Sequence, residues 1–218
     1  MEVYLELGTK RVFAAAVEWP GWCRGGRDEA AAIEALLAYR ERYAEAVGAA
    51  GGKLPTPATA KGLRIIERLS GGAGTDFGVP GNVPRLDEAA TSDKELERLV
   101  ELHAACWRTF KRVAARAKGH QLEPAGPRGG GRSVAKIGEH VAGAEAAYIA
   151  SIGVRYGGAA DDDTALRREF VAALRERAAG NLPERGPRGG RRWPARYAVR
   201  RSCWHLLDHA WEIEDRLR

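Results

Sequence analysis

The sequence predicts an α+β fold in which a small β-β-β-α-β unit precedes a bundle of four helices. Three observations lead to this expectation. Apolar residues alternate in the first part of the chain, residues 70–86 are rich in Gly and Pro, and long apolar stripes of helical spacing follow. We therefore expect an α/β domain over residues 1–70, a linker over residues 71–86 and a helical domain over residues 87–218.

The N-terminal unit is expected to begin with a β-hairpin. Residues 2–8 and 11–19 have the pattern of two strands, and Gly8-Thr9-Lys10 between them is a typical turn sequence. Residues 19–26 then predict a turn, a short third strand and another turn.

One helix and one strand complete this unit. Asp28 is a suitable N-cap for a helix that continues to about Val47, because the apolar residues in between follow helical spacing. Residues 48–57, rich in Gly and Pro, are expected to form a loop. Residues 63–69 predict a further strand.

The second half of the chain shows four long stretches of helical periodicity. They cover about residues 88–118, 133–153, 162–179 and 194–217. Pro194 suits the first turn of the last helix, because its missing N–H is not needed there. Four helices of this length predict a bundle.

Composition points to a cytoplasmic protein. The chain of 218 residues has 35 basic and 29 acidic side chains, and because these are interleaved we expect a solvated surface rather than a nucleic-acid partner. Three cysteines without a C-x-x-C pair favour a reducing compartment over a disulfide framework. No apolar run approaches the roughly 20 residues of a membrane span, and no signal peptide is visible.

The last predicted helix carries two histidines four residues apart, His205 and His209. On a helix such residues point the same way, offset by about 40° at roughly 100° per residue. Glu212 returns to nearly the same stripe, and His140 on another helix can supply a third imidazole. Three neutral imidazoles suit Zn, Ni, Fe or Cu, with at least one coordination position left to water or substrate.

Two segments carry a resemblance to a known family, residues 137–145 and residues 197–216. They place one histidine on the second helix of the bundle and an H-x-x-x-H pair on the fourth. In this the helical half resembles the DinB-like family of metal-binding four-helix bundles. The resemblance implies that one divalent metal ion is bound by three side chains, His140, His205 and His209.

A second resemblance is carried by residues 17–30, which include Trp19-Pro20-Gly21-Trp22. Here the N-terminal half is similar to a HicB-type antitoxin domain, a small β-β-β-α-β unit. The resemblance implies the fold of this half. The chain lacks the pattern of the helix-turn-helix or ribbon tail that such antitoxins often append to bind DNA.

The DinB-like resemblance implies a metal-dependent enzyme that acts on a small molecule. Related bundles include a mycothiol-dependent maleylpyruvate isomerase and thiol S-transferases, so a thiol-dependent transferase or isomerase, or a hydrolase, is expected. A divalent ion beside an open position stabilises a thiolate or hydroxide at neutral pH. The expected cofactors are Zn, Ni or Fe and a low-molecular-weight thiol.

The sequence leaves a second class of function open. A non-enzymatic binding or regulatory module would use the HicB-like unit as an interaction surface on a metal-stabilised bundle. A homodimer is compatible with both functions. The sequence does not identify further catalytic or cofactor-binding residues.

Polar residues near the three histidines are candidate hydrogen-bond partners for their rings. A ligand histidine needs an acceptor for its other ring nitrogen, and Glu139, Asp208 and Glu212 are candidates, although arginine salt bridges are the commoner role of such carboxylates. His103, on an apolar helical stripe, is expected to be a hydrogen-bonded core histidine, with a fourth ligand as the alternative.

Two similar loops precede the histidine-bearing helices. Residues 126–132 and 186–192 both contain Pro-Arg-Gly-Gly. Such loops at helix N-termini can bind an anion, whereas flexible, solvated loops are the interpretation that we favour.

Overall fold

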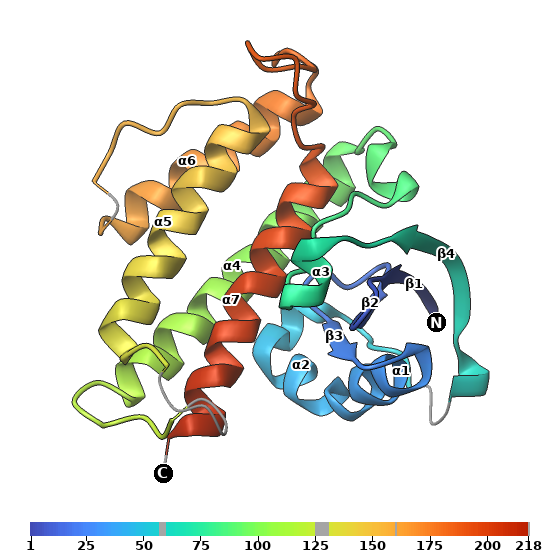
Figure 1. The fold of residues 1–218 in the computed structure, drawn as a ribbon. Coiled ribbons are helices and arrows are strands. Elements are labelled where there is room, and N and C mark those ends of the chain that lie inside the picture. The colour runs from blue at the N-terminus through green and yellow to red at the C-terminus, as the bar shows by residue number, and fades with distance from the viewer. Residues whose placement is uncertain (57–59, 125–130, 160, 218) are drawn as a thin grey trace.

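The chain forms an α+β fold in which a four-stranded sheet and a helical bundle lie side by side (Figure 1). The predicted fold class is thereby confirmed. The computed structural model describes residues 1–56, 60–124, 131–159 and 161–217. In this part of the chain, no helix combines the length and apolar character needed to cross a membrane.

The strands follow the predicted alternation of apolar residues. β1 (Glu2–Leu7), β2 (Val12–Ala16) and β3 (Cys23–Gly26) pair antiparallel in chain order, and β4 (Arg64–Ser70) pairs in parallel with β1. The resulting strand order is β3-β2-β1-β4. Because successive side chains alternate between the two faces of the sheet, each face buries its own set of apolar residues.

The helix predicted from Asp28 to Val47 is two helices, α1 (Glu29–Ala38) and α2 (Arg40–Val47). Asp28 caps α1 as predicted, since its Oδ1 accepts a hydrogen bond from the N–H of Ala31 at 2.8 Å. The break has a tertiary cause. Trp22 Nε1 donates to the carbonyl of Leu36 at 2.7 Å, and Tyr39 at the break packs edge-on against Trp211 of another helix.

The four long helices of the bundle lie close to the predicted ranges. They are α4 (Asp93–Arg116), α5 (Val134–Ile152), α6 (Asp163–Ala178) and α7 (Ala195–Arg216). The first helix starts later than predicted, because a separate short turn, η3 (Arg85–Glu88), precedes it. The helix itself begins at the Ser92 N-cap.

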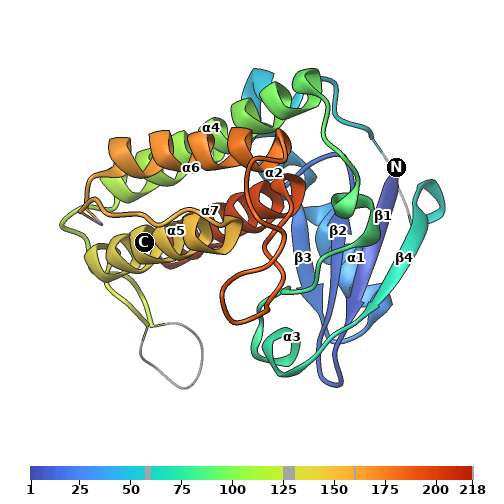
Figure 2. The ribbon, with the colours of Figure 1, turned by 90° about the horizontal axis from the view of Figure 1, so that it is seen from above.

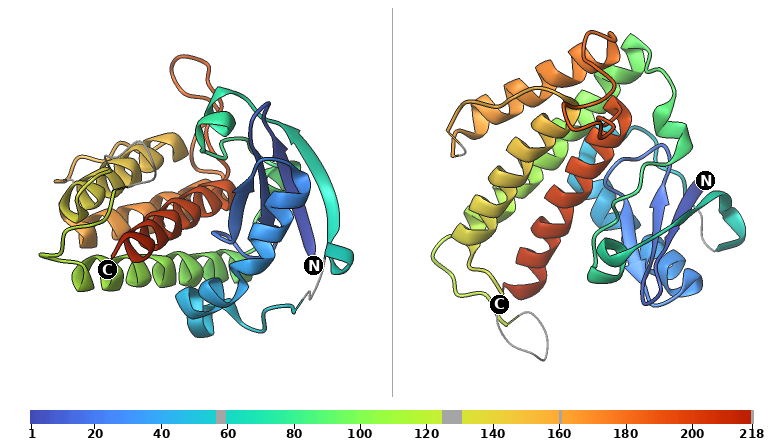
Figure 3. Two further views of the ribbon diagram at one scale, coloured as in Figure 1. Left: turned by 60° about the horizontal axis from the view of Figure 1, so that its bottom comes forward. Right: turned by 45° about the horizontal axis from the view of Figure 1, so that its top comes forward.

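The bundle is not a simple up-and-down arrangement. In Figure 1 and in the right view of Figure 3, the chain after α5 returns along the bundle, so that α6 runs in the same direction as α5. α4 and α7 share the opposite direction and pack against each other. As a result α7 has α5 on one side and the sheet on the other.

The predicted linker is attached to the sheet. It contains a short helix, α3 (Ala73–Phe77). The buried carboxylate of Glu6 accepts hydrogen bonds from Thr75 Oγ1 at 2.6 Å and from the backbone N–H groups of Gly81 and Asn82 at 3.1 and 3.0 Å. Figure 2 shows this segment running along the sheet towards the bundle.

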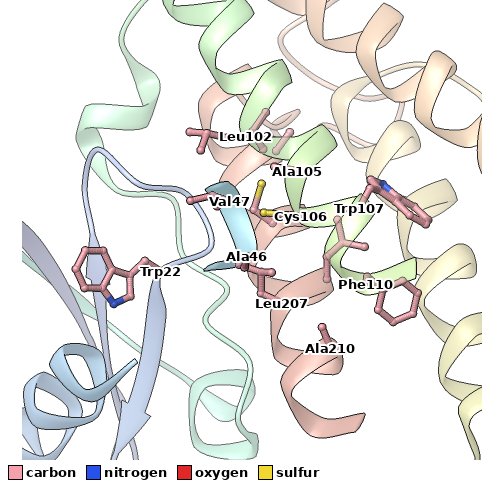
Figure 4. Close-up of a cluster of buried hydrophobic side chains, with 14 of the residues drawn as sticks. Trp22, Ala46, Val47, Leu102, Ala105, Cys106, Trp107, Phe110, Leu207 and Ala210 are labelled. Atoms are coloured by element: carbon pink, nitrogen blue, oxygen red, sulfur yellow. The ribbon is translucent and has the colours of Figure 1, made fainter. Parts of the chain in front are cut away.

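One apolar core extends from the sheet into the bundle (Figure 4). The loop between β2 and β3 packs closely against α7, because a Cβ built on Gly21 would lie 3.0 Å from Cys203 Cβ on that helix. Gly21 also has φ of +94°, a conformation that favours glycine. Figure 4 shows side chains of this core that come from four parts of the chain. They are Trp22 from the loop between β2 and β3, Ala46 and Val47 from α2, Leu102, Cys106 and Phe110 from α4, and Leu207 and Ala210 from α7.

Candidate metal centre

Three histidines from two helices meet on the face of α7 that looks towards α5. His205 and His209 lie one helical turn apart on α7, and His140 lies in the first half of α5. One ring nitrogen from each of the three lies within 4.8 Å of the other two. The structure therefore brings together all three of the metal ligands that the sequence predicts.

The spacing of the nitrogens fits a single ion. Nε2 of His205 and Nε2 of His140 are 3.1 Å apart, and the three ring centroids are 4.6 to 5.0 Å apart. Two nitrogens bound at 2.0–2.1 Å to a tetrahedral Zn²⁺ are separated by about 3.3 Å. The arrangement can thus hold a divalent ion with little movement of the rings.

Burial keeps the rings of His140 and His205 uncharged. His205 is 6% exposed, and burial, followed by the charges of His209 and Arg201, lowers its pKa to about 2. The pKa of the partly exposed His140 is also lowered, first by burial and then by His209. Both rings are neutral at pH 7, so their lone pairs are available to a metal ion.

Glu212 orients one of the three rings. Its Oε2 lies 2.8 Å from Nδ1 of His209, and its Oε1 accepts from Arg216 at 2.6 Å. The hydrogen bond from His209 is the largest cause of the lowered pKa of Glu212. An ionised Glu212 holds the proton of His209 on Nδ1 and leaves Nε2 for the metal.

The other two candidate acceptors have different roles. Asp208 pairs with Arg24 of β3 at 3.0 Å. Glu139 lines a cavity of about 410 Å³ together with Lys111 and Asp163. Neither carboxylate has a hydrogen bond to a ligand histidine among the described residues, and Asp208 has the arginine partner that was expected as the commoner role of such groups.

Aromatic packing, rather than a hydrogen bond, surrounds the Nδ1 side of His205. Its Nδ1 is buried and has no hydrogen-bond partner in the described part of the chain. The ring instead packs between Tyr148 of α5 and Trp204, with centroid distances of 5.9 and 6.1 Å.

His103 is a hydrogen-bonded core histidine, as expected. It is 1% exposed and stacks on Phe170. Its Nε2 lies 2.9 Å from Ser202 Oγ and 3.4 Å from Glu145 Oε2, and Ser202 donates to Glu145 at 2.7 Å. These contacts occupy His103, and it does not belong to the cluster of three.

The described residues beside the two Pro-Arg-Gly-Gly loops lie at opposite ends of α7. Residues 186–192 directly precede its first turn, whereas the carbonyl of Arg132 accepts from Arg216 in its last turn at 3.2 Å. Residues 126–130 of the first loop lie outside the described residues. The described parts of the two loops therefore do not form one common site.

Sequence reasoning missed one charged residue beside the centre, Arg201. It precedes His205 by four positions, and its guanidinium carbon lies 4.5 Å from the ring centroid of Trp204 and 5.5 Å from that of Tyr148. The four-residue spacing to His205 is the signal that could have found it.

Comparison with known proteins identifies no relative of this chain. No family model, no curated protein and no solved structure matches this chain. The candidate metal centre therefore depends on the geometry of these residues alone, and the DinB-like and HicB-like resemblances stay predictions.

Proposed function

We propose that the chain binds one divalent metal ion through His140, His205 and His209 and acts as a DinB-like, metal-dependent enzyme on a small molecule. The observation that carries the proposal is the convergence of three imidazole nitrogens within 4.8 Å. His205 is largely buried, and burial lowers its pKa to about 2, so this ring is neutral at pH 7.

The donor set supports a reactive site rather than a closed one. Structural zinc sites use four protein ligands, whereas catalytic sites often use three and leave the fourth position to water or substrate. In the described residues the cluster contains three side chains. Gly143, one turn after His140, is exposed, and a Cβ built on it would meet nothing within 4 Å. No side chain therefore projects from α5 at this position.

The proposed chemistry follows from an open position on a divalent ion. Zn, Ni or Fe held by three imidazoles would lower the pKa of a bound thiol or water. A low-molecular-weight thiol and a small electrophilic substrate would suit a transferase or isomerase, and bound water would suit a hydrolase. The crossover between α5 and α6 is in keeping with the helix order of the DinB-like bundles that the sequence resembles.

A non-enzymatic binding module is the second candidate. Its support is the sheet, in which β4 lies at an edge and pairs only with β1 among the described strands. An edge strand can accept a further strand from a partner. In this function the HicB-like sheet half would contact the partner, and the metal would stabilise the bundle that packs against it.

The first experiment is elemental analysis of the purified protein. We expect about one divalent ion per chain, and a sharp loss of metal when His140, His205 or His209 is replaced by alanine. His120→Ala is the matched control, because His120 is exposed and lies in a loop. Chelation should leave the helical circular dichroism signal intact, since the bundle has its own apolar core.

Two outcomes would decide between the candidates. A screen of thiol-dependent transfer and of hydrolysis, with the metal-loaded protein and its His140→Ala variant, tests the enzyme. If the metal binds but has four protein ligands and no exchangeable water, the binding module is favoured. Equal metal content in all variants would overturn the site itself.

A further inference from the structure

Arg201 occupies an unusual position next to the candidate metal centre. It lies on the same stripe of α7 as His205 and His209, one turn nearer the N-terminus. Its guanidinium lies near two aromatic rings, Tyr148 of α5 and Trp204 of α7. The buried ring of His205 packs against the same two residues. The guanidinium of Arg201 and the imidazole of His205 therefore share the same two aromatic neighbours.

The charge of Arg201 is not balanced within the described part of the chain. Its Nη1 is buried and has no hydrogen-bond partner among the described residues, and no ion pair of Arg201 is formed there. The other arginines of α7 do have carboxylate partners: Arg196 pairs with Glu95, Arg200 with Asp87 and Arg216 with Glu212.

Carboxylates near this part of the helix are already engaged elsewhere. Glu145 accepts a hydrogen bond from Ser202 at 2.7 Å, and Asp208 pairs with Arg24 at 3.0 Å. A buried N–H without an acceptor is unfavourable, and a guanidinium fixed over aromatic rings presents its planar fork in one orientation. The missing partner is thus an acceptor that comes from outside the described chain.

We propose that Arg201 binds a carboxylate of the substrate, so that the site takes small organic anions. This inference rests on the proposed metal-dependent function. One group of the ligand would occupy the open metal position, and its carboxylate would pair with Arg201, which lies one helical turn before His205 on α7. A dicarboxylate can supply both groups. Arg201 is then a specificity-determining residue.

The test compares dicarboxylates with a monocarboxylate on the cobalt-loaded protein. Acetate, malonate and succinate are titrated by calorimetry, and coordination is followed in the visible spectrum of Co²⁺. We expect malonate or succinate to bind at least about tenfold more tightly than acetate. Arg201→Gln should remove this preference while metal content and acetate affinity stay unchanged, and Arg201→Lys should keep part of it.

The matched control is Arg168→Gln, which removes the same charge from an exposed position on α6. It should retain the preference for dicarboxylates. If Arg201→Gln binds cobalt and keeps the full preference, the carboxylate subsite is overturned while the metal centre stands. If the wild-type protein binds no metal, the proposed function fails, and the subsite fails with it.

Discussion

The fold changes the protonation of His205. In an unfolded chain a histidine titrates near pH 6.5. Burial of His205, followed by the charges of His209 and Arg201, lowers its pKa to about 2. Between these two pH values the unfolded chain binds a proton that the native chain does not. The free energy of unfolding must therefore fall as the pH falls below about 6.5.

We expect the metal-free protein to lose stability on acidification, by up to about 1.4 kcal/mol per pH unit from this residue. Urea unfolding at pH 7, 6 and 5 measures the slope. His205→Asn should flatten it, because asparagine does not titrate, and the exposed His120→Asn should leave it unchanged. An equal slope in His205→Asn and the wild type would contradict the assignment.

At the scale of elements, one buried ion pair connects the sheet, η3 and α7. Arg200 donates to both carboxylate oxygens of Asp87 at 2.7 and 2.8 Å, and also to the carbonyls of Ala16 and Val17 at 3.0 and 3.1 Å. Arg200 is 5% exposed and Asp87 is fully buried. Neither charge can be left alone without a large penalty.

Replacing Arg200 by methionine should destabilise the protein by about 3–5 kcal/mol, because Asp87 would be buried without its partner. Adding Asp87→Asn should recover part of that loss, since the isolated charge is removed. Urea unfolding of the two single variants and the double variant forms the required cycle. A loss below about 1 kcal/mol in Arg200→Met would show that Asp87 finds solvent or another donor.

Helices whose limits are set by residues close in the sequence could be predicted from the sequence. The N-cap Asp28 located the start of α1, the periodicity of the bundle helices located them closely, and the spacing of His205 and His209 identified a shared face. The break at Tyr39 could not be predicted, because Trp22 and Trp211, the residues that cause it, are distant in sequence.

The same distinction holds for the candidate site. Glu212 was found because it lies three residues from His209 on one helix. The setting of Arg201 was missed because Tyr148, one of its two aromatic neighbours, comes from α5. The partners of His103 likewise come from two other helices, so the sequence could predict its burial but not its hydrogen bonds.

At the scale of the whole molecule, the sheet and the bundle share one core. Gly21 packs directly against Cys203 and Leu207 of α7, and Tyr39 packs edge-on against Trp211 of α7 with ring centroids 4.9 Å apart. Because the apolar contacts continue across the predicted boundary, we expect the two parts to unfold together.

Gly21→Ala tests this connection. The added Cβ would lie 3.0 Å from Cys203 Cβ, at a backbone φ of +94°. We expect a loss of about 2–4 kcal/mol from backbone strain and repacking together. Thermal unfolding followed by far-UV and near-UV circular dichroism should give coincident transitions in wild type and variant. Two separate transitions would show that the halves unfold independently.

The position of α7 makes the histidine cluster sensitive to the orientation of a single helix. Trp204, Asp208 and Trp211 contact the sheet half, whereas His205 and His209 face α5. A helix with its side chains has a radius of about 5–6 Å, so a rotation of about 10° about its axis moves an imidazole nitrogen by about 1 Å. Metal–ligand distances tolerate only about 0.2 Å. Any partner that shifts the sheet against α7 would therefore change metal affinity without touching the ion.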